Sequence, residues 1–147
     1  MAILEITLDT SKFNQALEKM QGNMKKEAKK ALVKVAEKVE GDAKYNIQSG
    51  ARSGRVYRRK GIQHQASAAG EFPKTDTGDL VRAISSEFSF DGLEVTVGSR
   101  ASAPHGLYLE FGTSKMAARP WLTPTVEANK RFIDKVFDNA MRGAIKK

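Results

Sequence analysis

The 147-residue sequence contains no cysteine. Disulfide scaffolds, thiolate zinc sites and cysteine nucleophiles are therefore excluded. The sequence also lacks an apolar run of membrane-spanning length, and its first residues alternate and carry acids where a secretory signal needs a basic start and an apolar block. We therefore expect a protein that stays in the cytoplasm in which it is made and has no membrane partner.

Aromatic residues are scarce, at 7% of the chain, which is too few to suggest a dedicated base-stacking platform. Positive charge is abundant: 25 Lys and Arg oppose 17 Asp and Glu, a formal net charge of +8 that favours an anionic partner. The hydrophobic content of 40% is close to the globular average. Length and composition together predict one folded domain over residues 1–147.

The N-terminal third predicts a strand followed by a long helix. Leu4, Ile6 and Leu8 alternate with polar residues, as in a half-buried strand. Apolar residues then recur every three or four positions from Ser11 until Gly50. A helix of about 35 residues would be near 50 Å long, so part of it must project or meet a neighbour unless a glycine breaks it. The apolar positions are Phe13, Leu17, Met20, Met24, Ala28, Ala31, Leu32, Val35, Val39, Ala43 and Ile47, and the glycines are Gly22 and Gly41.

Residues 51–76 lose this periodicity and form the most basic segment of the chain. We interpret them as a long flexible loop or arm that becomes ordered on a partner. The composition fits a nucleic-acid tail and a solvated or protein-binding segment about equally well. The residues expected to contact a partner or DNA are Arg52, Arg55, Tyr57, Arg58, Arg59 and Lys60.

A hairpin is predicted around a two-residue turn at Asp91-Gly92, because this dipeptide suits the positive φ angles of a type I′ turn. Counting outward from the turn, Phe90 faces Leu93 and Phe88 faces Val95; one step further, Ser86 faces Val97. The apolar side chains then share one face, which the long helix must cover.

Shorter helical signals flank this hairpin. Asp76 or Thr77 could cap a helix that ends near Ile84. A helical or extended piece over residues 107–111 ends at Gly112, and Thr123-Pro124 starts a terminal helix. The expected core face of that last helix is Val126, Ile133, Val136, Phe137, Ala140, Met141 and Ala144.

The expected fold class is thus α+β. A small antiparallel sheet, made of the N-terminal strand plus the hairpin, packs against the long N-terminal helix and the C-terminal helix, with the basic arm outside.

Catalytic signals are weak. His64 and His105 lack metal-ligand spacing to a second ligand, and no nucleophile elbow, phosphate-binding glycine loop or zinc-protease motif occurs. Glu110 lies between apolar neighbours, where an ion pair with an arginine such as Arg119 is favoured over catalysis. We therefore expect a protein that is not an enzyme and uses no metal and no cofactor.

Two strings resemble a known family. Tyr108-Leu109-Glu110-Phe111-Gly112-Thr113 is followed by Arg119-Pro120-Trp121-Leu122 ahead of a terminal helix, with Thr77-Gly78-Asp79-Leu80 upstream. The chain resembles the head-to-tail joining, or tail-completion, proteins of long-tailed bacteriophages, the gene-product-ten-like family of lambdoid phages. Trp121 stands where that family more often has Phe, and the arm is longer than in compact members.

The resemblance implies a non-enzymatic virion protein of the neck, assembled in the bacterial cytoplasm. It implies a ring, expected to be a hexamer, at the head-proximal end of the tail. The implied partners are a head connector or head-stopper protein and the major tail tube protein, with genomic double-stranded DNA in the channel as a further candidate. The residues expected to hold the fold are Gly78, Leu80, Tyr108, Glu110, Phe111, Gly112, Thr113, Arg119, Pro120 and Trp121.

Two other functions remain open at this stage. A stand-alone DNA- or RNA-binding protein would explain the positive charge and the basic arm. A small basic nuclease or toxin would have to use His64 or His105 together with Glu110 or Glu71.

Overall fold

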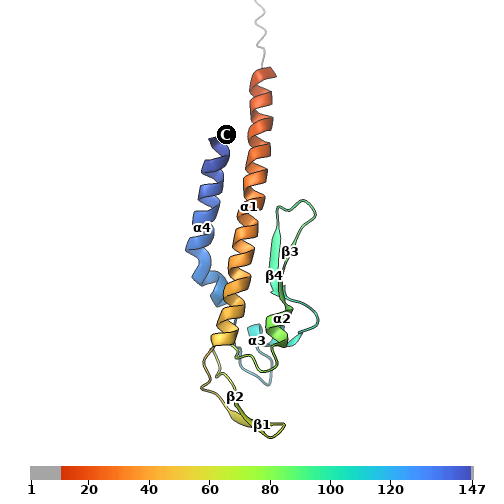
Figure 1. Ribbon diagram of the computed structural model, residues 1–147, viewed down its shortest axis with the longest axis vertical. Coiled ribbons are helices and arrows are strands. Elements are labelled where there is room, and N and C mark those ends of the chain that lie inside the picture. The colour runs from red at the N-terminus through yellow and green to blue at the C-terminus, as the bar shows by residue number, and fades with distance from the viewer. Residues whose placement is uncertain (1–10, 147) are drawn as a thin grey trace, which may run out of the picture.

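The computed structural model of the chain describes residues 11–146, so the strand expected at Leu4–Leu8 lies outside the described residues. Two helices form the long axis of the molecule: α1 (Ser11–Ser49) and α4 (Thr123–Ile145) run side by side in opposite directions (Figure 1). Two hairpins and two short helices gather around the C-terminal half of α1. These are β1 (Val56–Arg59), β2 (Ile62–Gln65), α2 (Asp79–Ala83), β3 (Ile84–Phe88), β4 (Val95–Ser99) and α3 (His105–Phe111).

The long helix predicted from the apolar spacing is confirmed, and neither Gly22 nor Gly41 breaks it. A single glycine costs a helix about 1 kcal/mol, which packing of the later turns of α1 against α4 offsets for Gly41, whereas Gly22 lies in the exposed turns. Burial is confined to the later turns, whereas every residue from 11 to 22 is exposed. The buried residues of α1 are Ala31, Val35, Ala36, Val39, Ala43 and Ile47.

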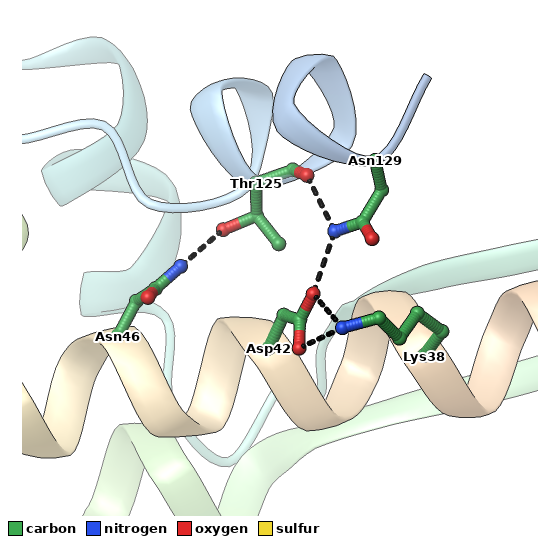
Figure 2. Close-up of polar contacts among 5 residues, drawn as sticks. All are labelled: Lys38, Asp42, Asn46, Thr125 and Asn129. Atoms are coloured by element: carbon green, nitrogen blue, oxygen red, sulfur yellow. Dashed lines mark hydrogen bonds and ion pairs between the residues drawn. The ribbon is translucent and has the colours of Figure 1, made fainter. Parts of the chain in front are cut away.

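The contact between α1 and α4 includes a polar cluster that the sequence did not predict (Figure 2). Thr125 and Asn129 on α4 are only 1% and 5% exposed. The Asn129 side-chain amide donates to Asp42 Oδ2 at 2.8 Å and to the Thr125 carbonyl at 3.0 Å. Asn46 donates to Thr125 Oγ1 at 3.3 Å, and Lys38 pairs with Asp42 at 2.7 Å. These directional bonds fix how α4 is placed along α1.

The expected core face of α4 is confirmed only in part. Ala144 is buried, but Val126 is 41% exposed, so its assignment to the core was wrong. Thr125 and Asn129 take the places nearest α1 in the first two turns, because they bond to the polar side chains of α1 described above. The half-buried members of the expected face are Ile133, Val136, Phe137, Ala140 and Met141.

The register predicted for the second hairpin is confirmed. Phe88 pairs with Val95 and Ser86 pairs with Val97 in the antiparallel β3–β4 ladder. The hairpin packs against α1, and the Ser86 hydroxyl donates to Glu40 Oε2 at 2.7 Å. The alternation of apolar and polar residues therefore determined which residues pair between β3 and β4, as expected where one face of a sheet is covered.

The turn of this hairpin differs from the type I′ prediction. Ser89 N–H donates to the Glu94 carbonyl at 3.1 Å, which leaves a four-residue loop, and Gly92 N–H closes a turn on the Ser89 carbonyl at 2.9 Å. Gly92 has a φ of 69°, whereas Asp91 does not have a positive φ, so the two-residue I′ geometry is absent. Phe90 consequently points into solvent and does not face Leu93 across the turn.

The segment expected to be a long flexible arm forms a hairpin instead. Strands β1 and β2 are joined by Lys60 and Gly61, both with positive φ (50° and 79°), and their base continues through bonds between residues 54–55 and Ala66. Arg59 pairs with Asp76 at 2.6 Å and ties the hairpin to the following segment. The expected single sheet is therefore corrected to two separate two-stranded sheets within residues 11–146.

The apolar core lies at the C-terminal end of α1, under both short helices. Trp121 is 2% exposed at its centre, and the indole Nε1–H donates to the Gly106 carbonyl at 2.9 Å. Gly78, with a φ of 79°, occupies the N-cap of α2. The predicted capping by Thr77 is present from one residue earlier, since the Asp79 N–H donates to Thr77 Oγ1 at 3.4 Å. The buried core members are Ala43, Ile47, Leu80, Ala83, Ile84, Ala103 and Trp121.

Candidate assembly surfaces

The first candidate surface is the free end of α1, here named the overhang and comprising residues 11–22. In Figure 1 this end of α1 extends beyond the C-terminal end of α4. At 1.5 Å per residue the overhang is about 18 Å long. Phe13, Leu17 and Met20 share one face of it at spacings of four and three residues, with exposed fractions of 64%, 36% and 38%. Because an isolated helix of this length is marginal in water, the overhang gains stability from any neighbour that covers this stripe.

The second candidate surface is an apolar groove of about 450 Å³ between α3, the end of β4 and the start of α4. Leu107, Tyr108 and Phe111 on α3 line it and are 60%, 51% and 75% exposed. Trp121, which is buried, and Leu122 also line it. Three large apolar side chains around one open groove form a concentrated apolar surface of the kind that marks a binding site.

Glu110 holds this region together by capping α4. Its Oε2 accepts the backbone N–H groups of Trp121 (2.7 Å) and Leu122 (2.9 Å). Its Oε1 accepts the N–H of Thr123 at 2.9 Å and the Thr123 hydroxyl. The first amides of a helix have no partner within the helix, and a carboxylate there also meets the positive end of the helix dipole.

The ion pair expected between Glu110 and Arg119 is therefore replaced by this cap, since both carboxylate oxygens are directed at the start of α4. Burial acts to raise the pKa of Glu110, but the hydrogen bonds from Thr123 and from the amides of Leu122 and Trp121 outweigh it. The pKa of Glu110 is consequently below its ordinary value of 4.5. Glu110 thus stays ionised and serves the fold.

The remaining motif residues build a tight connection between α3 and α4. Gly112 ends α3 with a φ of 75° and donates its N–H to the Tyr108 carbonyl at 2.8 Å. Thr113 N–H donates to the Met116 carbonyl, and Arg119 N–H returns to the Leu109 carbonyl at 2.7 Å. A Cβ on Gly112 would lie 2.9 Å from backbone atoms of this return segment, which explains the glycine.

Further members of the expected structural set also lie in or beside the core. Leu80 is 6% exposed, and Gly78 begins α2. Pro120 is half-buried next to Trp121. Tyr108 and Phe111 differ from these residues, because their side chains lie open at the groove.

The basic residues predicted to contact a partner are placed on and beside the β1–β2 hairpin. Tyr57 stacks on His64 with ring centroids 5.5 Å apart, and Arg59 is engaged by Asp76. The other four basic side chains are exposed and form no ion pair with any residue in 11–146; they are Arg52, Arg55, Arg58 and Lys60.

The residues considered for a nuclease have other roles. His64 stacks on Tyr57 and lies 3.4 Å from Asp76, and Glu71 accepts bonds from Ser53 and the Ala68 N–H. His105 is the first residue of α3, and Glu110 caps α4. Over residues 11–146 no cluster of acidic or histidine side chains has the arrangement of a metal site, and no helix there is both long and apolar enough to cross a bilayer.

These features define the class of protein as an α+β chain with exposed apolar and basic surfaces. Comparison with known families then identifies the chain more closely. The chain belongs to the bacteriophage HK97-gp10-like tail-component family, which matches it over residues 11–112, more than half of its length. Comparison with curated proteins and with solved structures gives no match.

The matched region runs from the start of α1 to the end of α3. It includes Gly78 and Leu80 and most of the Tyr108–Thr113 string, whereas the Arg119–Leu122 string lies beyond it. The resemblance drawn from the sequence is therefore confirmed at the level of the family. The protein is a phage tail component, and a structural family of this kind implies a role other than catalysis.

Proposed function

We propose that this tail component is a neck subunit that completes the tail. Copies of the chain assemble into a ring, with six as the expected number, at the head-proximal end of the tail. The ring joins the tail tube protein to the head connector or head-stopper protein and leaves a channel for double-stranded DNA. Membership of the tail-component family and the unpartnered apolar surfaces of the fold support this proposal.

The observation that carries the proposal is the overhang. One face of the overhang carries three apolar side chains, those of Phe13, Leu17 and Met20. No other element of residues 11–146 covers this part of α1. Burying each of these side chains in a subunit contact would contribute about 1 to 2 kcal/mol after allowing for their partial burial already. In a ring this gain recurs at every contact, so a weak pairwise interface becomes a stable assembly.

A subunit that both assembles with its own copies and joins neighbouring neck proteins needs separate surfaces for the two kinds of contact. The overhang lies at one end of the molecule, and α3 lies toward the other (Figure 1). The apolar groove is lined by side chains of α3. We assign the overhang to contacts between copies and the groove, with Leu107 and Phe111, to the docking of a neck partner. The basic hairpin is then available for the DNA or for an acidic protein surface.

The change Leu17→Lys tests the assignment of the overhang. We expect the variant to require at least a tenfold higher concentration to assemble, since about 1.4 kcal/mol lost per contact already gives that factor. Its helix content should remain unchanged because Leu17 is exposed and is not a member of the apolar core. Light scattering coupled to size-exclusion chromatography measures the assembly, and circular dichroism measures the helix.

Gln15→Lys is the matched control, because it adds the same charge on the opposite face of the overhang. It should assemble as the unmodified chain does. A chain that stays monomeric at every concentration and never joins purified tails would contradict the proposal. Equal assembly by the Leu17→Lys variant would contradict the role of the overhang.

A stand-alone nucleic-acid-binding protein remains the second candidate, favoured by the four unpaired basic side chains near β1. Such a protein would bind duplex DNA in the absence of any neck partner, and its affinity would fall steeply with salt. A titration of labelled duplex at low salt distinguishes the two functions. Absence of binding there removes the second candidate and leaves the assembly role intact.

A further inference from the structure

The β3–β4 hairpin has an open edge along β4. The bonded pairs of its ladder follow from the two ends, where Ser89 N–H donates to the Glu94 carbonyl and Arg100 N–H donates to the Ala83 carbonyl. In an antiparallel ladder, pairs that share hydrogen bonds alternate with pairs that do not. The residues of β4 that belong to the unbonded pairs therefore direct their N–H and C=O groups away from β3; they are Val95, Val97 and Ser99.

These outward groups have no backbone partner within residues 11–146. The edge can be approached, because Thr96 is exposed and Val95 and Val97 are only half-buried. Natural proteins usually protect such an edge with a charged side chain, a proline or a bulge. β4 contains no charged residue and no proline, and its register with β3 is continuous. An unprotected edge of this kind is a template for pairing with another strand.

The opposite edge, along β3, is less suited to pairing. The N–H of Ile84 already donates to the Leu80 carbonyl, which leaves Ser86 and Phe88 as the outward residues with an N–H to offer. Glu87 also places a charge within this strand. β4 instead has branched apolar residues at two of its three outward positions, and a further row of apolar side chains would pack well beside them.

A strand that fits the β4 edge is predicted at the start of the same chain. Within residues 1–10, apolar side chains occur at every second position, at Leu4, Ile6 and Leu8, with polar residues between them. Paired along β4, this segment would place its apolar side chains on the same face as the valines of β4. Its polar side chains would then lie on the outer face of the sheet.

The segment cannot reach β4 of its own chain. Ser86, which pairs with Val97, donates to Glu40, so this part of the hairpin lies beside α1 at Glu40. At 1.5 Å per residue of helix, Glu40 is about 44 Å from Ser11. At 3.6 Å per residue of extended chain, Leu4 can lie at most about 25 Å from Ser11. The segment can therefore pair with β4 only in a second copy of the chain.

We propose that residues 4–8 of one copy add to the β4 edge of a neighbouring copy as a third strand. This inference rests on the proposed function, since it describes how adjacent subunits of the ring are joined. The segment continues from the overhang, which is already assigned to contacts between copies. Backbone hydrogen bonds to β4 hold the strand, and its alternating side chains set the register. Each copy gives one strand and receives one, which is a head-to-tail contact of the kind that closes into rings.

The change Ile6→Lys tests the apolar side of the added strand. We expect this variant to need at least a tenfold higher concentration to assemble, because a charge replaces an apolar side chain beside the valines of β4. Thr7→Lys is the matched control, since it adds the same charge one residue further along, on the outer face. It should assemble as the unmodified chain does. Size-exclusion chromatography with light scattering measures the assembly, and circular dichroism should show unchanged helix content because neither residue lies in α1.

The possible results separate this inference from the proposed function. Equal assembly by the Ile6→Lys variant, or by a chain that lacks residues 2–9, overturns strand exchange and leaves the ring standing. An equal loss in the Thr7→Lys and Ile6→Lys variants overturns the predicted alternation of faces. An unmodified chain that stays monomeric at every concentration overturns both proposals.

Cysteine cross-linking locates the added strand, because the natural chain has no cysteine. Glu5→Cys, Thr7→Cys and Asp9→Cys chains are each mixed, as dilute subunits, with a Thr96→Cys chain, then concentrated and oxidised. We expect a disulfide-linked dimer in at least one mixture, since neighbouring strands lie about 4.8 Å apart. A Glu87→Cys chain is the control: Glu87 pairs with Thr96 from β3, which puts it two strand spacings from the added strand, too far for a disulfide. Cross-linking to the Glu87→Cys chain in place of the Thr96→Cys chain, or to neither, overturns the assignment to β4.

Discussion

Replacing Glu110 with Gln provides the sharpest test of how the Tyr108–Thr113 and Arg119–Leu122 strings of the sequence work together in the fold. The carboxylate accepts two bonds at each oxygen, three of them from backbone amides at the start of α4. Glutamine keeps one accepting oxygen and replaces the other with an NH₂ group, which donates. Two of the four bonds are therefore lost, and the negative charge at the helix N-terminus is lost with them.

The expected cost is about 2 kcal/mol near neutral pH. Two hydrogen bonds to a charged group would contribute about 3 to 6 kcal/mol, and because water reaches part of this site and replaces some of that energy, the effect falls below this range. For a chain of this length the unfolding temperature should fall by about 4 to 8 °C. Thermal and urea unfolding followed by circular dichroism measure both quantities.

The pH dependence separates the charge from the packing. Because the pKa of Glu110 is lowered in the folded state, its stabilisation is fully present above the unfolded value of about 4.5 and is lost as pH falls through the folded pKa. The difference between the two proteins should therefore shrink in acid. Glu94→Gln, at an exposed position next to the β3–β4 loop, is the control and should unfold as the unmodified chain does. Equal stability of the Glu110→Gln variant at neutral pH, or an undiminished difference in acid, would refute the cap.

Two further predictions concern packing. Asn129→Asp places a second carboxylate beside Asp42 and should lower the free energy of unfolding by about 2 kcal/mol at neutral pH, and by less in acid. Asn139→Asp, on the exposed side of α4, is the control and should change the free energy of unfolding little. Urea unfolding at neutral and at acid pH checks both expectations. Gly112→Ala should destabilise the chain by at least about 1 kcal/mol, because φ is 75° and the new Cβ would meet backbone atoms at 2.9 Å. Gly143→Ala, in open space on α4, should instead stabilise it by up to about 1 kcal/mol, and unchanged melting of both glycine variants would count against the geometry.

The elements predicted from the sequence are those that bury one face, so that apolar residues recur along the chain at a regular spacing. The repeat of apolar residues from Ser11 onward predicted α1, and alternation predicted the register in which Phe88 meets Val95. Gly112 ends its helix as its position in the sequence indicated. In each case a periodic or single-residue signal within one segment is enough, because the backbone geometry concerned is local.

The first hairpin was missed for a physical reason. Both of its strands are largely exposed and β1 is basic, so the usual alternation of buried apolar and exposed polar residues is absent, and the composition resembles that of a loop. The signal that could have revealed it is the turn at Lys60-Gly61, whose positive φ angles suit a two-residue hairpin. At Asp91-Gly92 the opposite error arose, since a favourable dipeptide did not prevent a longer loop.

By itself the sequence determined the long helix, the pairing of the second hairpin, the excess of positive charge and, through its motif strings, the family. Only the tertiary structure decided that Glu110 caps α4 and that Asn129 bonds to Asp42 across the helix pair. The physical reason is distance along the chain. Helix and strand periodicity is encoded among neighbours, whereas which polar groups meet depends on how finished elements pack, and no local pattern records that.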